Sequence, residues 1–313
     1  MLNQLGIEKI TIDLPFRLDH VNCFLAEGEE GYMMIDTGLN DKNARAVWKE
    51  TLKNKKVAKL VLTHLHPDHT GLAGTLQQFT DADVMMSEAD AVALDQIWTD
   101  EAIPKLLNDY KKADVPERLT DGIVSILKDF RSAVTPTPNV NHYLEEGERI
   151  EIGKEQYEVI FTPGHSDGLV CFFNEDRNVL LSTDHILPKI TPNISYWYYG
   201  KQNPLQDYED SLHKIKRLDA EYVIPSHGEP FYDANRRIEE IWAHHLERFE
   251  QTLEAIKEPA TAFEACESLF KKELSVYDYQ FAIGEAIAHL EYLRHKGECD
   301  REMEAGKWLY FIK

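Results

Sequence analysis

A run of three histidines and one aspartate within six residues constrains this chain more than any other feature. His64, His66, Asp68 and His69 follow directly after the short apolar run at residues 57–62. Such a run is typical of a strand buried on both faces, and ligands of open α/β sheets bind at the carboxyl ends of strands. Imidazole and carboxylate suit Zn²⁺ and related first-row metals. The sequence therefore predicts a metal site at the end of a buried strand.

Three later segments repeat this arrangement, each with a metal-binding residue type at the end of a predicted strand. His165 lies in Thr-Pro-Gly-His after residues 157–162, Asp184 follows residues 179–183, and His227 follows residues 222–225. Each signal alone is weak, because a single His or Asp near a Gly is usually a turn residue. Together with the first cluster they offer seven ligands, more than one tetrahedral ion uses.

The remaining pattern places these clusters in a mixed α/β chain. Strands are expected at residues 6–14, 21–27 and 31–36, a helix at 41–52, and a second β series between 149 and 183. A polar, helical stretch at about 95–135 interrupts the β pattern, and we interpret it as an insertion. Helices are expected at 207–218, 235–256, 260–272 and 279–296, followed by a hairpin over 297–312 that turns at Glu304-Ala305-Gly306.

The order of these clusters resembles the metallo-β-lactamase superfamily, whose H-x-H-x-D-H signature matches residues 64–69. The resemblance implies an αββα sandwich, a fold of the α+β or α/β class, with the metals at one edge of the two sheets. It implies a first metal held by His64, His66 and His165 and a second held by Asp68, His69 and His227. Asp184 would bridge the two. The metal would be Zn²⁺, with iron or manganese as alternatives.

The chain resembles the glyoxalase II and broad-specificity hydrolase branches more than the true β-lactamases, which usually lack a bridging Asp at this position. Helix, helix and hairpin at the C-terminus resemble a winged helix, as in the branch that includes lactamase-β-like protein 2. We therefore expect a metallo-β-lactamase domain at residues 1–245. A linker helix and a small winged-helix-like domain are expected at 246–313.

The resemblance implies a hydrolase in which the metals lower the pKa of a shared water to about 7. The leading hypothesis is hydrolysis of a thioester or lactone, with Asp68 assisting the leaving group as a catalytic residue. His185, Tyr196 and Trp197 are expected to line the substrate pocket. The alternatives are a metallo-endoribonuclease or other phosphodiesterase, a mononuclear iron sulfur-oxidising enzyme, and a non-catalytic binding module.

The net charge and the cysteines of the chain indicate which partners it binds and in which cellular compartment it is expected. The formal net charge of −21 at pH 7 disfavours binding to nucleic acid or to an anionic membrane. The four cysteines are scattered without a CxxC pair, and no signal peptide or membrane-length apolar stretch is expected. These features predict a cytoplasmic protein with a small-molecule substrate, and a homo-oligomer is compatible with them. We expect the acidic tail to pack on the core or on a second subunit and not to bind RNA.

Overall fold

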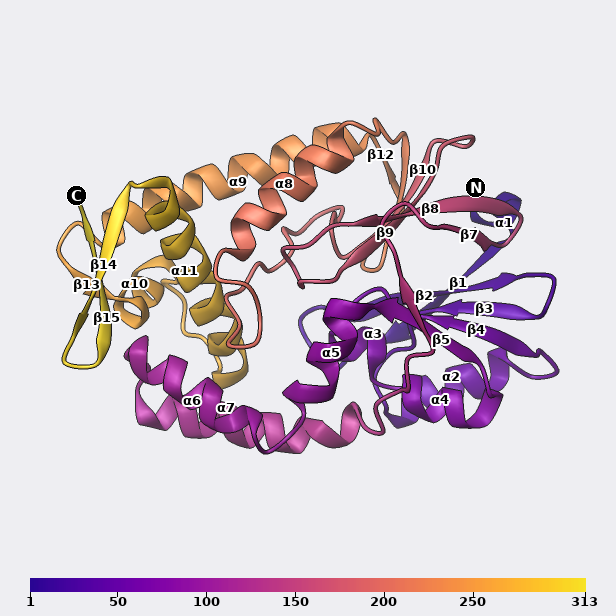
Figure 1. Ribbon diagram of the computed structural model, residues 1–313, viewed down its shortest axis with the longest axis horizontal. Helices are drawn as coiled ribbons and strands as arrows, with labels where there is room; N and C mark the ends of the chain where they lie inside the picture. Colours follow the sequence, from indigo (N-terminus) through magenta and orange to yellow (C-terminus); the bar gives the residue numbers. More distant parts are fainter.

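Two six-stranded sheets lie face to face in the computed structural model, which describes residues 1–313, and helices cover their outer faces (Figure 1). The first sheet begins as an antiparallel meander and continues with three parallel pairings. Its strands, in spatial order, are β1 (Ile7–Asp13), β2 (His20–Glu27), β3 (Tyr32–Ile35), β4 (Val57–Val61), β5 (Asp83–Ser87) and β6 (His142–Leu144).

The second sheet is an antiparallel meander from β7 to β10, followed by a parallel crossover to β11 and an antiparallel edge strand, β12. Its strands, in chain order, are β7 (Arg149–Ile152), β8 (Glu155–Phe161), β9 (Val170–Asn174), β10 (Val179–Thr183), β11 (Tyr222–Pro225) and β12 (Phe231–Tyr232). The crossover runs through α8 (Pro204–Lys216). This helix begins three residues before the predicted start, because Pro204 occupies its first turn and the side chain of Asn203 caps it.

Side chains alternate between two cores along the buried strands, as the pleat of a sheet requires. In β9, Val170 and Phe172 point into the space between the sheets, whereas Cys171 and Phe173 face the helices outside. The inter-sheet core draws residues from both sheets, which closes the sandwich. The predicted αββα architecture is confirmed.

The outer helices bury one face each against a sheet. Trp48 of α2 is fully buried, and its indole N–H donates to the carbonyl oxygen of Thr37 at 2.8 Å. On the first sheet lie α2 (Lys42–Thr51), α4 (Ala73–Thr80) and α5 (Glu88–Ile97). On the second sheet lie α8 and α9 (Ala234–Ala255). Two further helices have a single turn each, α1 (Leu2–Leu5) and α3 (Pro67–Thr70).

The predicted insertion is helical and forms α6 (Ala102–Lys112), α7 (Glu117–Phe130) and the 3₁₀ turn η1 (Arg131–Ala133). It packs against the C-terminal part of the chain. A Cβ added at Gly122 would lie 2.8 Å from Val276, so the glycine lets α7 approach the C-terminal helix closely. Lys307 also pairs with Asp114 at 2.7 Å. The insertion and the tail therefore share one apolar core, with the tail at the left of Figure 1 and α6 and α7 below it.

Helix, helix and hairpin follow one another in the tail, in the predicted order. The elements are β13 (Ala260–Thr261), α10 (Ala262–Leu269), α11 (Val276–Lys296), β14 (Cys299–Glu304) and β15 (Lys307–Ile312). The three strands form a small sheet in the order β13-β15-β14 (Figure 1). Ile287, Leu290 and Leu293 share one apolar core with α8 and α9, so the predicted packing of the tail on the core is confirmed.

The division at residue 245 stays a prediction, because α9 runs through it without a break. No helix is long and apolar enough to cross a membrane.

Candidate metal centre

The first cluster of predicted ligands lies where β4 gives way to α3. β4 ends at Val61, and Pro67 begins α3 with its fixed φ, so residues 62–66 form a turn at the carboxyl edge of the first sheet. His64 and His66 lie in this turn, and His69 lies on α3 itself, where it is fully buried.

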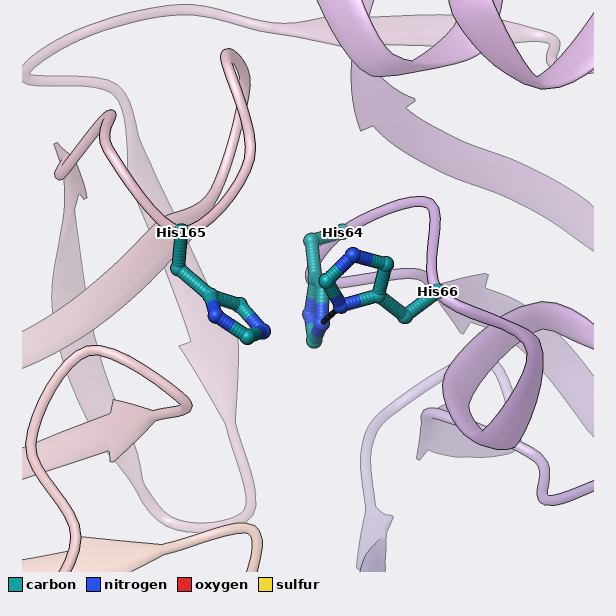
Figure 2. A group of neighbouring side chains, drawn as sticks. All are labelled: His64, His66 and His165. Atoms are coloured by element: carbon teal, nitrogen blue, oxygen red, sulfur yellow. Dashed lines mark hydrogen bonds between the residues drawn. The ribbon is translucent and has the colours of Figure 1, made fainter. Parts of the chain in front are cut away.

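Three further segments from the second sheet meet this turn. His165 lies between β8 and β9, Asp184 follows β10, and His227 follows β11. Figure 2 shows the rings of His64, His66 and His165 converging across the gap between the two halves of the site. The structure thus brings all seven predicted ligands together.

The ligand atoms form three overlapping groups in which all atoms lie within 4.8 Å of one another. The groups are His64, His66 and His165; His64, His69 and Asp184; and Asp68, His69 and His227. Ligands about 2.0–2.1 Å from a tetrahedral zinc ion lie about 3.3 Å apart, so this spacing fits a metal centre.

Asp184 lies at the centre of the cluster. Its Oδ2 is 3.5 Å from Nε2 of His165, 3.3 Å from Nε2 of His227 and 3.6 Å from Nε2 of His69. Nε2 of His64 lies 4.0 Å away. This oxygen therefore adjoins histidines of both the predicted first site and the predicted second site.

Several buried polar atoms of the cluster have no hydrogen-bond partner in the protein. They are Nε2 of His66, His69, His165 and His227, and Oδ1 of Asp184. A buried polar atom without a partner costs about 1–3 kcal/mol, so five in one place require compensation. Divalent cations among them would supply it, and the donor set of imidazole nitrogen and carboxylate oxygen fits such ions.

The opposite ring nitrogens are held by the protein, which aims the free nitrogens at the centre. Nδ1 of His165 contacts the carbonyl oxygen of Asn193 at 2.7 Å. Nδ1 of His227 contacts the carbonyl oxygen of His20 at 2.6 Å, and Nδ1 of His69 contacts the carboxylate of Asp36 at 2.8 Å. His20 matches no ligand position in the sequence; its backbone carbonyl holds His227, and its Nε2 accepts a hydrogen bond from Gly228 N at 2.9 Å.

Four of the seven predicted ligands are held in the protonation state that binds a metal, whereas burial is outweighed at His69 and His227, whose pKa the carboxylates of Asp68 and Asp184 raise. Burial lowers the pKa of His66 to about 3 and that of His64 well below its usual value, so both rings are neutral at pH 7. Burial alone would raise the pKa of Asp68, but His69 and His227 hold it at about 2. Burial likewise opposes ionisation of Asp184, yet the same two histidines keep its pKa well below the usual range.

Two buried aspartates that support the site were missed in the sequence. Asp36 ends the β3 segment and accepts hydrogen bonds from the backbone N–H and the hydroxyl of Thr63 at 2.9 and 2.8 Å, as well as contacting His69. Asp36 lies at the end of a predicted strand, so the rule that identified Asp184 in the sequence would also have identified Asp36.

Asp90, in the first turn of α5, carried no such signal. It accepts hydrogen bonds from Leu65 N at 2.9 Å, Ser166 Oγ at 2.7 Å and Gly168 N at 2.7 Å. It therefore ties the turn that carries His64 and His66 to the loop that carries His165. A Cβ at Gly168 would lie 2.1 Å from Ser87 Oγ, so only glycine permits this approach. Burial raises the pKa of Asp90 to about 6, which leaves it ionised at neutral pH.

Substituting Asp90 with asparagine is expected to weaken zinc binding about 10- to 100-fold, since the loss of a supporting partner has this effect in metal sites. An amide nitrogen cannot accept the bonds that one carboxylate oxygen accepts now. Competition with a chromophoric chelator measures the affinity. Asp95→Asn, on an exposed position of the same helix, is the matched control. Equal affinities in the two variants would contradict the positioning role.

The three residues expected in the substrate pocket lie in different places. Trp197 lines a hollow beside His165, together with Leu65, Ala93 and Tyr199. His185 is fully buried and packs against Tyr208, with ring centroids 5.3 Å apart. The hydroxyl of Tyr196 donates to Gln202 at 3.2 Å, away from the cluster. The structure does not bring His185 or Tyr196 to that hollow, because each is held by contacts of its own.

Two family models match the chain. The metallo-beta-lactamase superfamily matches residues 16–227, which include all seven predicted ligands. The metallo-beta-lactamase-like C-terminal domain matches residues 249–313.

Individual relatives agree with these matches. The chain is 27% identical to the probable metallo-hydrolase YqjP of Bacillus subtilis, over 96% of each protein. It is 28% identical to the acyl-coenzyme A thioesterase MBLAC2 of Homo sapiens, over 68% of this chain and 75% of the relative. The crystal structure of a metallo-beta-lactamase family protein from Thermus thermophilus superposes with a TM-score of 0.87 at 31% identity, covering 98% of this chain and 99% of that chain. The chain therefore belongs to the metallo-beta-lactamase superfamily, and it is a hydrolase of that fold.

Proposed function

We propose that this chain hydrolyses a small ester-like substrate, a thioester or a lactone, with two divalent metal ions bound at the cluster. His64, His66 and His165 would hold one ion, and Asp68, His69 and His227 would hold the other. The observation that carries the proposal is the position of Asp184 Oδ2, which lies 3.5 Å from Nε2 of His165 and 3.3 Å from Nε2 of His227. An oxygen so placed suits a ligand shared by both ions.

Such a pair of ions supplies Lewis acidity and lowers the pKa of water to about 7, which suits attack on a carbonyl carbon at neutral pH. The protein's own groups divide the remaining tasks. Asp184 is the more enclosed carboxylate, with 6% of its side chain exposed, and would serve as a ligand only. Asp68 has 18% of its side chain exposed, so it is the carboxylate that a departing thiol or alcohol reaches. We assign to Asp68 the role of assisting the leaving group.

The names of two relatives support an acyl substrate. One is the acyl-coenzyme A thioesterase described above, and the other, 23% identical, is the atrochrysone carboxyl ACP thioesterase AacuM of Aspergillus aculeatus. Both names describe hydrolysis of a thioester.

The ribonuclease alternative gains no support from the charges of the tail. Four basic residues of the tail are paired with carboxylates. The pairs are Arg294–Glu291 at 2.8 Å, Arg301–Glu291 at 2.7 Å, Lys296–Glu209 at 3.2 Å and Lys307–Asp114 at 2.7 Å. A cation that already neutralises a carboxylate releases little free energy on meeting a phosphate, so this surface is poorly suited to RNA.

A substrate panel tests the proposal. The metal-loaded protein is assayed with thioesters, lactones, bis-p-nitrophenyl phosphate and single-stranded RNA, each beside the His66→Ala variant to subtract contaminating activity. We expect hydrolysis of a thioester or a lactone and neither RNA cleavage nor RNA binding in a filter assay. Salt-sensitive RNA binding that is accompanied by cleavage, with no acyl hydrolysis, would reject the proposal in favour of the nuclease.

A further inference from the structure

Eight large aromatic side chains from five segments of the chain are only half-buried, although rings of this size usually belong to a core. They come from the β1–β2 loop, the end of α5, α7, the loop between β10 and α8, and α11. The residues are Phe16, Trp98, Phe130, Trp197, Tyr198, Tyr199, Tyr277 and Phe281. We call this set the aromatic collar.

The collar forms an unbroken series of ring contacts. Every neighbouring pair lies within the 4.5–7 Å range of interacting aromatic rings. The centroid distances are Trp98–Phe130 6.3 Å, Phe130–Phe16 5.8 Å, Phe16–Tyr277 5.2 Å, Tyr277–Phe281 5.2 Å, Phe281–Trp197 6.2 Å, Trp197–Tyr199 6.0 Å and Tyr199–Tyr198 5.0 Å. The two ends of the series meet again, because Trp98 and Tyr198 line one common hollow.

One side of the collar adjoins the metal centre. Trp197 and Tyr199 line the hollow that His165 also lines. The same loop carries Asn193, whose carbonyl oxygen contacts Nδ1 of His165 and whose side chain donates to Glu285 of α11 at 3.3 Å. The collar is thus anchored to the residue that positions a predicted ligand.

The other side of the collar opens into the second hollow, under the insertion. Ile97, Leu106 and Leu127 line this hollow with Trp98 and Tyr198, and most of its lining is apolar.

The two hollows are neighbours. Ala93 lines the hollow beside His165, and Ile97 lines the second one. These residues are four apart on α5 and therefore lie on the same face, about one turn or 5–6 Å from each other. Tyr199 and Tyr198, adjacent in the chain, line the first and the second hollow respectively. The surface between the two hollows, which we call the path, therefore follows one face of α5 from Ala93, near His165, to Ile97, beneath α6 and α7.

We propose that this path, walled by the aromatic collar, binds an extended apolar acyl group, so that the substrate is an ester or thioester of a medium-chain or aryl carboxylic acid. This inference rests on the proposed acyl hydrolysis and narrows its substrate class. The scissile carbonyl carbon lies at the metal cluster, and the acyl chain extends past Trp197 and Tyr199 toward Ile97. Burial of each added methylene stabilises the bound state enough to raise kcat/KM about fourfold.

Chain-length dependence is the direct test. Acyl thioesters of N-acetylcysteamine, from acetyl to decanoyl, share one uncharged leaving group, and the released thiol is titrated with a disulfide reagent. In the unaltered protein kcat/KM should rise about fourfold per methylene over the first several carbons. Phe281→Ala should lower the ratio of decanoyl to acetyl kcat/KM at least tenfold. Phe79→Ala, which removes a ring that is 83% exposed, should leave that ratio unchanged.

A second pair of variants tests the far hollow without removing a ring. Ile97→Trp fills the hollow and should shift the preferred acyl chain to a shorter length. Leu107→Trp, on the exposed side of α6, adds the same side chain outside it and should not shift the preference. If Phe281→Ala fails to fold, the comparison of Ile97→Trp with Leu107→Trp still tests whether the acyl chain enters the second hollow.

A binding measurement separates failure of this inference from failure of the proposed function. Calorimetry with butan-1-ol, octan-1-ol and decan-1-ol, which need no hydrolysis, should show affinity that rises with length and falls in Phe281→Ala. If thioesters are hydrolysed with no dependence on chain length and decan-1-ol does not bind, the acyl path is wrong while the proposed function stands. If decan-1-ol binds as expected and no ester is hydrolysed, the path is upheld and the proposed function is wrong.

Discussion

Replacing His66 with alanine is expected to lower kcat/KM roughly a thousandfold or more. The substitution removes one of three imidazoles that would hold the first metal ion, and a bound metal contributes several kcal/mol to transition-state stabilisation. The fold should survive, because His66 is itself only partly buried and lies outside all three apolar cores. Steady-state kinetics and the thermal midpoint of the purified variant measure both effects.

His244→Ala is the matched control. His244 is an exposed residue of α9 with no contact to the cluster. The activity and the thermal stability of the variant should therefore match those of the unaltered protein. Equal losses of activity in the two variants would mean that the assignment of ligands by position in the chain is wrong.

The protein is expected to carry close to two transition-metal ions per chain, and chelation should abolish its activity. Seven ligands exceed the four that one tetrahedral ion uses, and the five unpartnered buried atoms extend over both halves of the cluster. Asp184→Asn should reduce the content to one ion or fewer, because its carboxylate adjoins histidines of both groups. Plasma mass spectrometry against protein concentration gives the ratio, and added Zn²⁺ or Mn²⁺ should restore the chelated enzyme.

A content of one ion, with Asp68 and His227 unliganded in a crystal, would contradict the dinuclear centre. If that ion were iron, the hypothesis of a mononuclear sulfur-oxidising enzyme would take precedence. Asp95→Asn, which touches none of the ligands, should retain the full metal content and serves as the control for loss during purification.

Most of the helices and strands could be predicted from periodicity in the sequence. Strands buried on both faces, such as β4 and β10, are visible as short apolar runs, and the long helices α9 and α11 are visible as amphipathic or apolar stretches. β12 and β13 were not predicted, because two residues are too few to show alternation. β6 was missed for a similar reason, since only one of its three residues is buried.

The seven predicted ligands could be found because each ends a predicted strand or belongs to the first motif. Their supporting residues could not be found in the same way. Asp90 has its effect through Leu65, Ser166 and Gly168, which lie 25 to 78 positions away in the chain. A helical Asp in the first turn also has a local explanation, favourable interaction with the helix N-terminus, so nothing in the sequence distinguished it.

By itself the sequence determined most helices and strands and the identity of the seven residues that meet at the cluster, because local periodicity and strand-end position depend on residues close together in the chain. The αββα fold and the superfamily were implied by the resemblance of the motif at residues 64–69 and of the later ligands to a known family. Only the tertiary structure decided which nitrogen of each histidine faces the centre, that His185 packs behind the site, and that eight aromatic rings from five segments form one collar. Those features arise from contacts between distant segments, whose free energy of packing depends on three-dimensional proximity that no local pattern records.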